Sequence, residues 1–126
     1  MNAPFLGAIN YLNLCIFVEC MVTLIYCPCK YDDEAREIAR YLLKKKLIAC
    51  ANIFPINSLY TWKGKKIEQA ETVLLCKTTK AQAKKAVAEI KKRHSYRCPA
   101  ILVFPAKANE EFEKWVGASV NKSASP

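Results

Sequence analysis

The sequence predicts an α/β (α+β) protein with the element order β-α-β-β-α-β and one further helix at its C-terminal end. Segments rich in β-branched and aromatic residues alternate with segments whose apolar residues recur at helical spacing. The chain has 126 residues, of which 52% are hydrophobic and 25% charged. This length and composition fit one globular domain.

The first strand and the first helix have the clearest patterns. Residues 21–27, MVTLIYC, are rich in strand-forming side chains, and Pro28 is expected to end this strand. A helix is expected over residues 33–46, where lysines at the C-terminal end favour the helix dipole. Its apolar face comprises Ala35, Ile38, Ala39, Leu42 and Leu43.

A long β-hairpin is expected next. Residues 48–62 form its first arm, with a bend or bulge near Pro55 and Asn57, and residues 71–78 form the returning arm after a turn at 63–65. Typical strands have about five or six residues. Part of the hairpin is therefore expected to project from the domain and to find a partner.

The remaining elements complete a ferredoxin-like sandwich. A second helix carries an apolar stripe from Ala83 to Ile90, with His94 on the same face. Residues 100–104 are expected to form a strand that Pro105 closes. A last helix over residues 110–116 is expected to turn Phe112, Trp115 and Val116 inward. This order is the split β-α-β arrangement, with both main helices on one face of a four-stranded sheet.

One domain is expected over residues 21–120, between an apolar N-terminal extension over 1–20 and a frayed tail over 121–126. Residues 1–20 contain no Lys or Arg, so the basic start of a secretory signal is missing. The apolar stretch 11–18 is too short to span a bilayer. We therefore expect no membrane partner.

The formal net charge of +9 does not by itself indicate a nucleic-acid partner, because the lysines are spread over expected helix faces and the hairpin turn. Tyr60, Trp62, Tyr96 and Trp115 could stack on bases, as in RNA-binding ferredoxin-like modules. The glycine-aromatic signature of those modules is absent from the central strands. No nucleic-acid partner is expected.

The cysteines do not predict a disulfide framework. Their number, seven, is odd, and Cys50 and Cys76 lie in apolar runs typical of strands, where thiols pack as small hydrophobic groups. A reducing compartment, the cytoplasm, is therefore the expected location.

A soft or borderline metal could bind where Cys27 and Cys29 flank Pro28, together with His94. Thiolate and imidazole ligands suit copper or zinc. Alternatively, Cys27 packs as a hydrophobic residue and the helix dipole favours His94. A Cys–His pair also serves nucleophilic catalysis. However, the chain has no nucleophile elbow, phosphate loop or dinucleotide fingerprint, so no enzymatic activity is expected.

Two segments resemble the signature of the CutA divalent-cation tolerance family. Residues 47–78, LIACANIFPINSLYTWKGKKIEQAETVLLCKT, resemble its A-C-x-N-I arm, its S-x-Y-x-W-x-G hairpin tip and its strand ending in K-T. Residues 94–105, HSYRCPAILVFP, resemble its H-P-Y-x-x-P-x-I-L-x-x-P block. With the opening strand and the closing F-x-x-W, the resemblance covers residues 21–116.

The resemblance implies a homotrimer in which hairpins of neighbouring subunits pair edge to edge. It implies copper or another divalent cation as the ligand, with Cys27 and His94 as metal ligands. It also implies that Trp62, Lys77 and Tyr96 line the cleft between subunits.

Three positions depart from the family pattern. Ser95 replaces a usual Pro, Arg97 a carboxylate or amide, and Ala100 a common Glu. These changes reduce the negative charge available to a divalent ion. The alternative function is that of a PII-like regulatory trimer, which would bind a small anionic effector at the subunit clefts, with Lys77 and Arg97 supplying positive charge.

Overall fold

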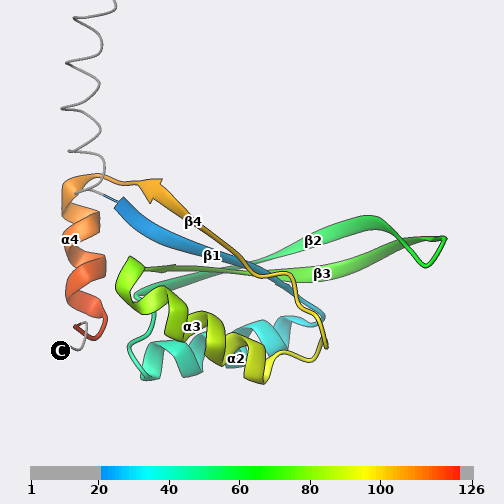
Figure 1. Cartoon of the computed structure of the whole chain (residues 1–126), viewed down its shortest axis with the longest axis horizontal. Helices are drawn as coiled ribbons and strands as arrows, with labels where there is room; N and C mark the ends of the chain where they lie inside the picture. Colours follow the sequence, from blue (N-terminus) through cyan, green and yellow to red (C-terminus); the bar gives the residue numbers. More distant parts are fainter. Residues whose placement is uncertain (1–20, 123–126) are drawn as a thin grey trace, which may run out of the picture.

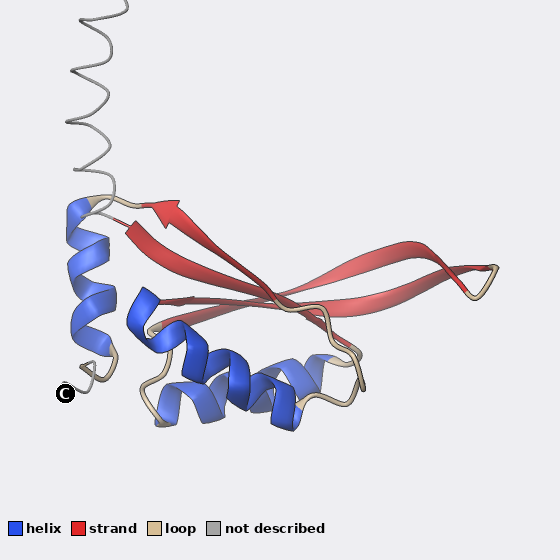
Figure 2. Cartoon of the chain, in the orientation of Figure 1, coloured by secondary structure: helices blue, strands red, loops and turns tan. Residues whose placement is uncertain are grey.

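The computed structural model describes residues 21–122, so the expected N-terminal extension and the last four residues lie outside the described range. A four-stranded antiparallel sheet in the order β2-β3-β1-β4 carries α2 and α3 on one face (Figures 1 and 2). The elements are β1 (Met21–Cys29), α2 (Asp32–Lys44), β2 (Cys50–Trp62), β3 (Lys65–Thr78), α3 (Lys80–Arg93), β4 (Leu102–Lys107) and α4 (Glu110–Ser119). The predicted ferredoxin-like order with an extra C-terminal helix is confirmed.

The main core lies between the sheet and helices α2 and α3. Side chains alternate between the two faces of a strand, so Ile25, Cys27 and Cys29 of β1 all point toward the helices. Leu42 of α2 and Ile90 of α3 are fully buried against them. The two cysteines of β1 are therefore core residues on the helix-covered face.

Helix α2 follows the predicted pattern except at one position. Acidic residues occupy its first turn and Lys44 its last, as the helix dipole favours. Ala35, Ile38, Ala39 and Leu42 are buried. Leu43 was expected on the apolar face but is 43% exposed. Leu42 is the last buried residue of the helix.

The β2–β3 hairpin projects beyond the helix-covered part of the sheet (Figure 1). Its pairing runs without interruption from Cys50–Lys77 to Trp62–Lys65, so the predicted bulge is wrong. Pro55 is accommodated because β2 is an edge strand, where a missing N–H need not break the ladder. Lys63 (φ 50°) and Gly64 (φ 79°) are both left-handed, as a two-residue type I′ turn requires.

Two prolines do not end their strands as predicted. Strand β1 continues through Pro28 to Cys29, and Pro105 lies inside β4, paired with Thr23. Strand β4 is an edge strand, and its pairing with β1 stops at Tyr26–Leu102, so Pro28 also has a free side. Proline is tolerated in a strand where its ring nitrogen faces no partner.

Helix α4 closes one end of the sheet and buries only Val116 fully. The prediction that Trp115 faces inward is wrong, since Trp115 is 49% exposed and stacks on Phe112 at a centroid distance of 5.6 Å. Beyond α4, Asn121 donates to the carbonyls of Lys45 and Lys46 and accepts from Gln82. Asn121, the first residue of the predicted frayed tail, is thus held by hydrogen bonds.

The second face of the sheet is largely uncovered in the described chain. Helix α4 packs near its end, beside Leu24. Away from α4, Phe54, Leu102 and Phe104 are all substantially exposed. The sheet also has two open edges, β2 and β4. Within residues 21–122, no helix has the length and apolar character needed to cross a membrane.

Adjacent leucines of α2 provide a test of this packing. Leu42 is fully buried and Leu43 is 43% exposed. We expect Leu42→Ala to lower the free energy of unfolding by about 2–5 kcal/mol, because it removes buried methyl groups and leaves a cavity. The matched control Leu43→Ala is expected to cost less than about 1 kcal/mol. Denaturant unfolding at one protein concentration measures both, and equal losses would contradict the assigned helix orientation.

Candidate metal centre

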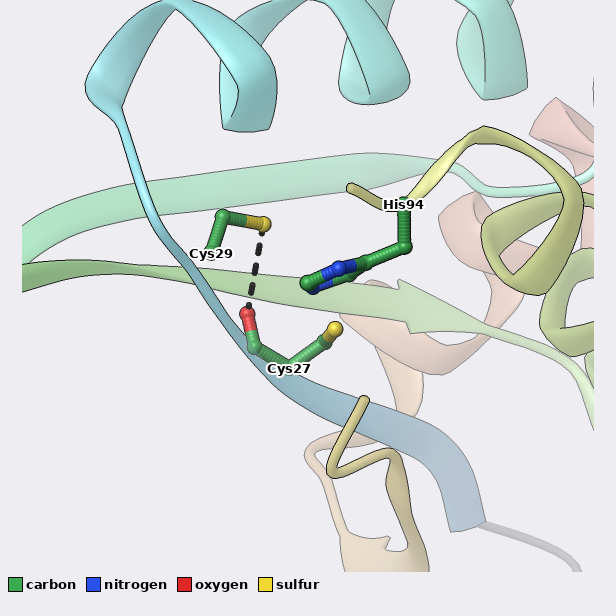
Figure 3. A group of neighbouring side chains, drawn as sticks. All are labelled: Cys27, Cys29 and His94. Atoms are coloured by element: carbon green, nitrogen blue, oxygen red, sulfur yellow. Dashed lines mark hydrogen bonds between the residues drawn. The ribbon is translucent and has the colours of Figure 1, made fainter. Parts of the chain in front are cut away.

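Three donor side chains meet beneath the end of β1. The sulfur atoms of Cys27 and Cys29 and a ring nitrogen of His94 lie within 4.8 Å of one another (Figure 3). Both cysteines and the His94 side chain are inaccessible to solvent. The cysteines come from one strand and the histidine from the end of α3, so the group forms only in the folded chain.

Hydrogen bonds fix the position of the His94 ring. Its backbone N–H caps α3 by donating to Ile90 O at 2.9 Å. In the ring, Nε2 lies 2.9 Å from Pro28 O, and Nδ1 lies 3.0 Å from the backbone nitrogen of Tyr96. A carbonyl can only accept and an amide N–H can only donate, so Nε2 carries the proton and Nδ1 accepts. The neutral imidazole is thus held at both nitrogens.

The short β4 strand explains why Pro28 is available to His94. Because the β1–β4 pairing stops at Tyr26–Leu102, the Pro28 carbonyl has no partner strand on that side. A buried carbonyl without a partner is costly. The imidazole of His94 supplies the hydrogen-bond partner that β4, which ends its pairing at Tyr26, does not provide.

Glu34, at the start of α2, accepts hydrogen bonds from the loop before α2 and from the loop after α3. It accepts from the backbone N–H of Lys30 at 3.1 Å and of Ser95 at 2.5 Å, and it lies 3.8 Å from His94 Nδ1. Burial alone would raise its pKa, but the hydrogen bonds from Ser95 and Lys30 hold the pKa of this carboxyl below its ordinary value. Glu34 therefore stays ionised beside the thiol–imidazole group.

The thiol of Cys29 is held in its protonated form. Cys29 donates to Cys27 O at 3.7 Å. The hydrogen bond with Cys27 raises the pKa of Cys29, and so do burial and the nearby negative charges of Glu34 and Glu71. Burial also raises the pKa of the neighbouring core thiol Cys76 to about 12. A metal ion entering this group must therefore displace thiol protons.

A cavity of about 730 Å³ lies beside the metal centre. Its lining combines aromatic side chains from the hairpin and the α3–β4 connection with two basic residues, Lys30 and Arg97. Pro28, whose carbonyl holds His94, also lines it. The aromatic residues are Tyr60, Trp62 and Tyr96.

A buried carboxylate anchors the cavity wall. Glu71 is 8% exposed and accepts from Ser58 Oγ at 2.6 Å and from Tyr96 Oη at 2.5 Å. Burial, followed by the hydrogen bond to Glu71 and its negative charge, raises the pKa of Tyr96 above its ordinary value. The phenol is therefore held as a hydrogen-bond donor that links β3 to the loop after His94.

The structure groups some of the predicted site residues and separates one. Cys27 and His94 lie in the thiol–imidazole group, and Trp62 and Tyr96 line the same cavity. Lys77 lies elsewhere in this chain: it pairs with Leu24 of β1, and its Nζ is 5.5 Å from the Phe112 ring centroid.

Cys29, already a candidate from the sequence, and two further residues, Glu34 and Glu71, complete the site. Strand alternation alone places Cys29 on the same face as Cys27. Glu34 and Glu71 carry no comparable sequence pattern, because their partners Ser95 and Tyr96 lie 61 and 25 positions away. Their roles required the tertiary structure.

Comparisons with known proteins agree with this architecture. The family model described as "CutA1 divalent ion tolerance protein" matches residues 23–119. The chain belongs to this family. It is 38% identical over 98 residues to a divalent-cation tolerance protein CutA of Thermotoga maritima, covering 77% of this chain and 97% of the relative. It is also 38% identical to the Archaeoglobus fulgidus CutA, covering 79% and 99%.

Solved structures of CutA proteins share the fold. The Archaeoglobus fulgidus structure, described as a periplasmic divalent cation tolerance protein, superimposes with a TM-score of 0.76 at 37% identity, covering 79% of this chain and 99% of that one. CutA1 from Oryza sativa gives 0.77 at 28% identity, covering 82% and 96%. Relatives from distant organisms thus share this CutA1 architecture.

The Tyr96–Glu71 contact gives a titration test in this CutA1 chain. Tyr96 is expected to ionise at higher pH than an exposed tyrosine, because burial and the Glu71 carboxylate disfavour the phenolate. Tyr96→Phe should therefore remove a late step that the parent shows in the near-ultraviolet absorbance titration. Since the folded-state pKa is raised, the stability that this contact adds is complete below the ordinary tyrosine pKa and is lost at higher pH. Identical high-pH titrations of the parent and of Tyr96→Phe would contradict this assignment.

Proposed function

We propose that this CutA1-family chain binds divalent cations at the Cys27–His94 centre and contributes to divalent-cation tolerance, the role in the names of its relatives. The observation that carries the proposal is the convergence of Cys27, Cys29 and His94 within 4.8 Å. Copper is the proposed ion, because sites with nitrogen and sulfur donors bind copper most strongly among the first-row divalent metals. The role is binding rather than catalysis, in a reducing, cytoplasmic setting.

The donor set fits a borderline or soft ion. Thiolate and imidazole donors suit copper and zinc, whereas Mg²⁺ and Ca²⁺ require mainly oxygen ligands. The ring of His94 can bind a metal only if Nδ1 releases the Tyr96 N–H or Nε2 loses its proton and leaves Pro28. Metal entry therefore involves a local rearrangement of the 94–96 segment.

We further propose that the chain assembles as a homotrimer. Strands β2 and β4 leave open edges, and unpaired edges invite pairing with another chain. The uncovered sheet face adds exposed apolar area at Phe54, Leu102 and Phe104. A closed ring of three copies would cover the edges and place the projecting hairpin of one subunit against its neighbour.

The cavity supports a second candidate function, the binding of a small anionic effector as in PII-like trimers. Lys30 and Arg97 supply positive charge in its lining, and Trp62 and Tyr96 supply aromatic surfaces. Glu71 does not oppose an anion strongly, because its oxygens already accept from Ser58 and Tyr96. Retention of a phosphate-bearing ligand but of no divalent ion would favour this function.

Metal binding is tested with Co²⁺ and Zn²⁺, which thiols do not reduce. Cys27→Ser and His94→Ala should each weaken binding of reduced protein at least about tenfold, because each removes a ligand. Cys50→Ser, at a half-buried thiol outside the group, is the control and should bind as the parent does. Calorimetric titration measures the affinities, and parental affinity in both ligand variants would refute the proposed centre.

Assembly is tested by light scattering at micromolar concentration. The parent is expected at three times the chain mass of 14.3 kDa. Phe104→Asp should lower that mass, because it places a charge in the open apolar face. Tyr31→Asp, at the exposed β1–α2 connection, should leave it unchanged. A parent that scatters as a single chain would exclude the trimer.

A further inference from the structure

The thiol–imidazole group contains one more sulfur than the Cys27–His94 pair requires. Cys29 lies two residues after Cys27 on the same face of β1, and both sulfurs are fully buried. Figure 3 shows the two cysteine side chains and the His94 ring as close neighbours, with donor atoms within 4.8 Å of one another. The second thiol changes the chemical class of ion that this centre can hold.

The number of donors distinguishes the possible ions. Structural zinc is four-coordinate, and among residues 21–122 this group offers three His, Cys, Asp or Glu donors. Monovalent copper is a soft d¹⁰ ion that forms stable complexes with two or three ligands, and thiolates are the donors that select it. Two sulfurs and one imidazole can thus fill the coordination sphere of Cu⁺, whereas a tetrahedral Zn²⁺ would need a fourth ligand.

The hydrogen bonds of the group divide the donors into two kinds. The His94 ring is held at both nitrogens, by Pro28 O and by the Tyr96 N–H. Each thiol makes only a long, weak S–H contact to a backbone carbonyl at 3.7 Å. An ion can therefore recruit the two sulfurs without breaking the contacts that hold His94, a two-coordinate arrangement open to Cu⁺.

Burial also favours the monovalent ion. Free Cu⁺ disproportionates in water and is oxidised by oxygen, so a protein that retains it must exclude solvent. The two sulfurs and the His94 side chain are closed to solvent, beneath Pro28 and the wall of the adjoining cavity. The site combines soft ligands with a dry environment.

We propose that Cys29 makes this centre a site for monovalent copper, with Cys27 and Cys29 as a two-thiolate pair and His94 as an optional third ligand. The inference rests on the proposed metal-binding function and names the ion that the second thiol selects. Binding replaces both S–H bonds by S–Cu bonds, releases two protons to solvent and changes no oxidation state.

The test is an anaerobic competition between reduced protein and a chromophoric Cu⁺ chelator, supplied with Cu⁺ alone. The parent should take one Cu⁺ per chain from the chelator. Cys29→Ala should bind Cu⁺ at least about tenfold more weakly. Cys76→Ala is the matched control, because it removes an equally buried thiol of the same core that lies outside the group. Cys98→Ala removes an exposed thiol, and both controls should retain parental affinity.

Parallel titrations with Co²⁺ separate this inference from the proposed function. Cys29→Ala should change Co²⁺ affinity less than threefold, since the divalent ion depends on Cys27 and His94. Parental Cu⁺ affinity in Cys29→Ala, or equal losses for Cu⁺ and Co²⁺, would overturn the assignment. Failure of the parent to bind Co²⁺ would refute the divalent proposal alone. Cys29→Ser, judged folded by circular dichroism, repeats the comparison should Cys29→Ala not fold.

Discussion

The hydrogen bond between the His94 imidazole and the Pro28 carbonyl is the contact on which the site depends. It joins the end of β1 to the end of α3, two segments 66 positions apart. Without it, the Pro28 carbonyl would keep only the long contact from Cys27 Sγ where β4 no longer pairs with β1. The same contact brings the imidazole to the sulfurs of Cys27 and Cys29 and leaves Nδ1 to accept from Tyr96. This one contact therefore places the imidazole next to two sulfurs that β1 already holds on one face.

The position of β1 in the sheet gives the site two different faces. Strand β1 lies between β3 and β4, so its alternate residues point either into the helix-covered core or toward the uncovered face. Cys27 and Cys29 enter the core, where both side chains are closed to solvent. Pro28, between them, lines the aromatic and basic cavity. The thiol–imidazole group and the aromatic, basic cavity thus lie on opposite faces of β1.

Local pattern was sufficient to predict the fold but not the details of the site. The helices and the long hairpin follow from side-chain periodicity and from the Lys63–Gly64 turn, which depend only on neighbouring residues. The prolines were misjudged, since their tolerance depends on which strand edge lacks a partner. Trp115 was assigned inward although α4 buries only Val116. Glu34 and Glu71 could not be predicted, because each acts through a residue distant in the sequence.

The 94–96 segment connects the two faces physically. The Tyr96 backbone N–H holds His94 Nδ1, while its phenol donates to Glu71 in the wall of the cavity. A metal that takes Nδ1 as a ligand must displace that N–H, and the displaced backbone carries the Tyr96 ring with it. An ion held only by Cys27 and Cys29 would leave both hydrogen bonds of Tyr96, to His94 and to Glu71, intact. In the proposed metal centre, only imidazole ligation through Nδ1 would require the Tyr96 backbone, and with it the cavity wall, to shift.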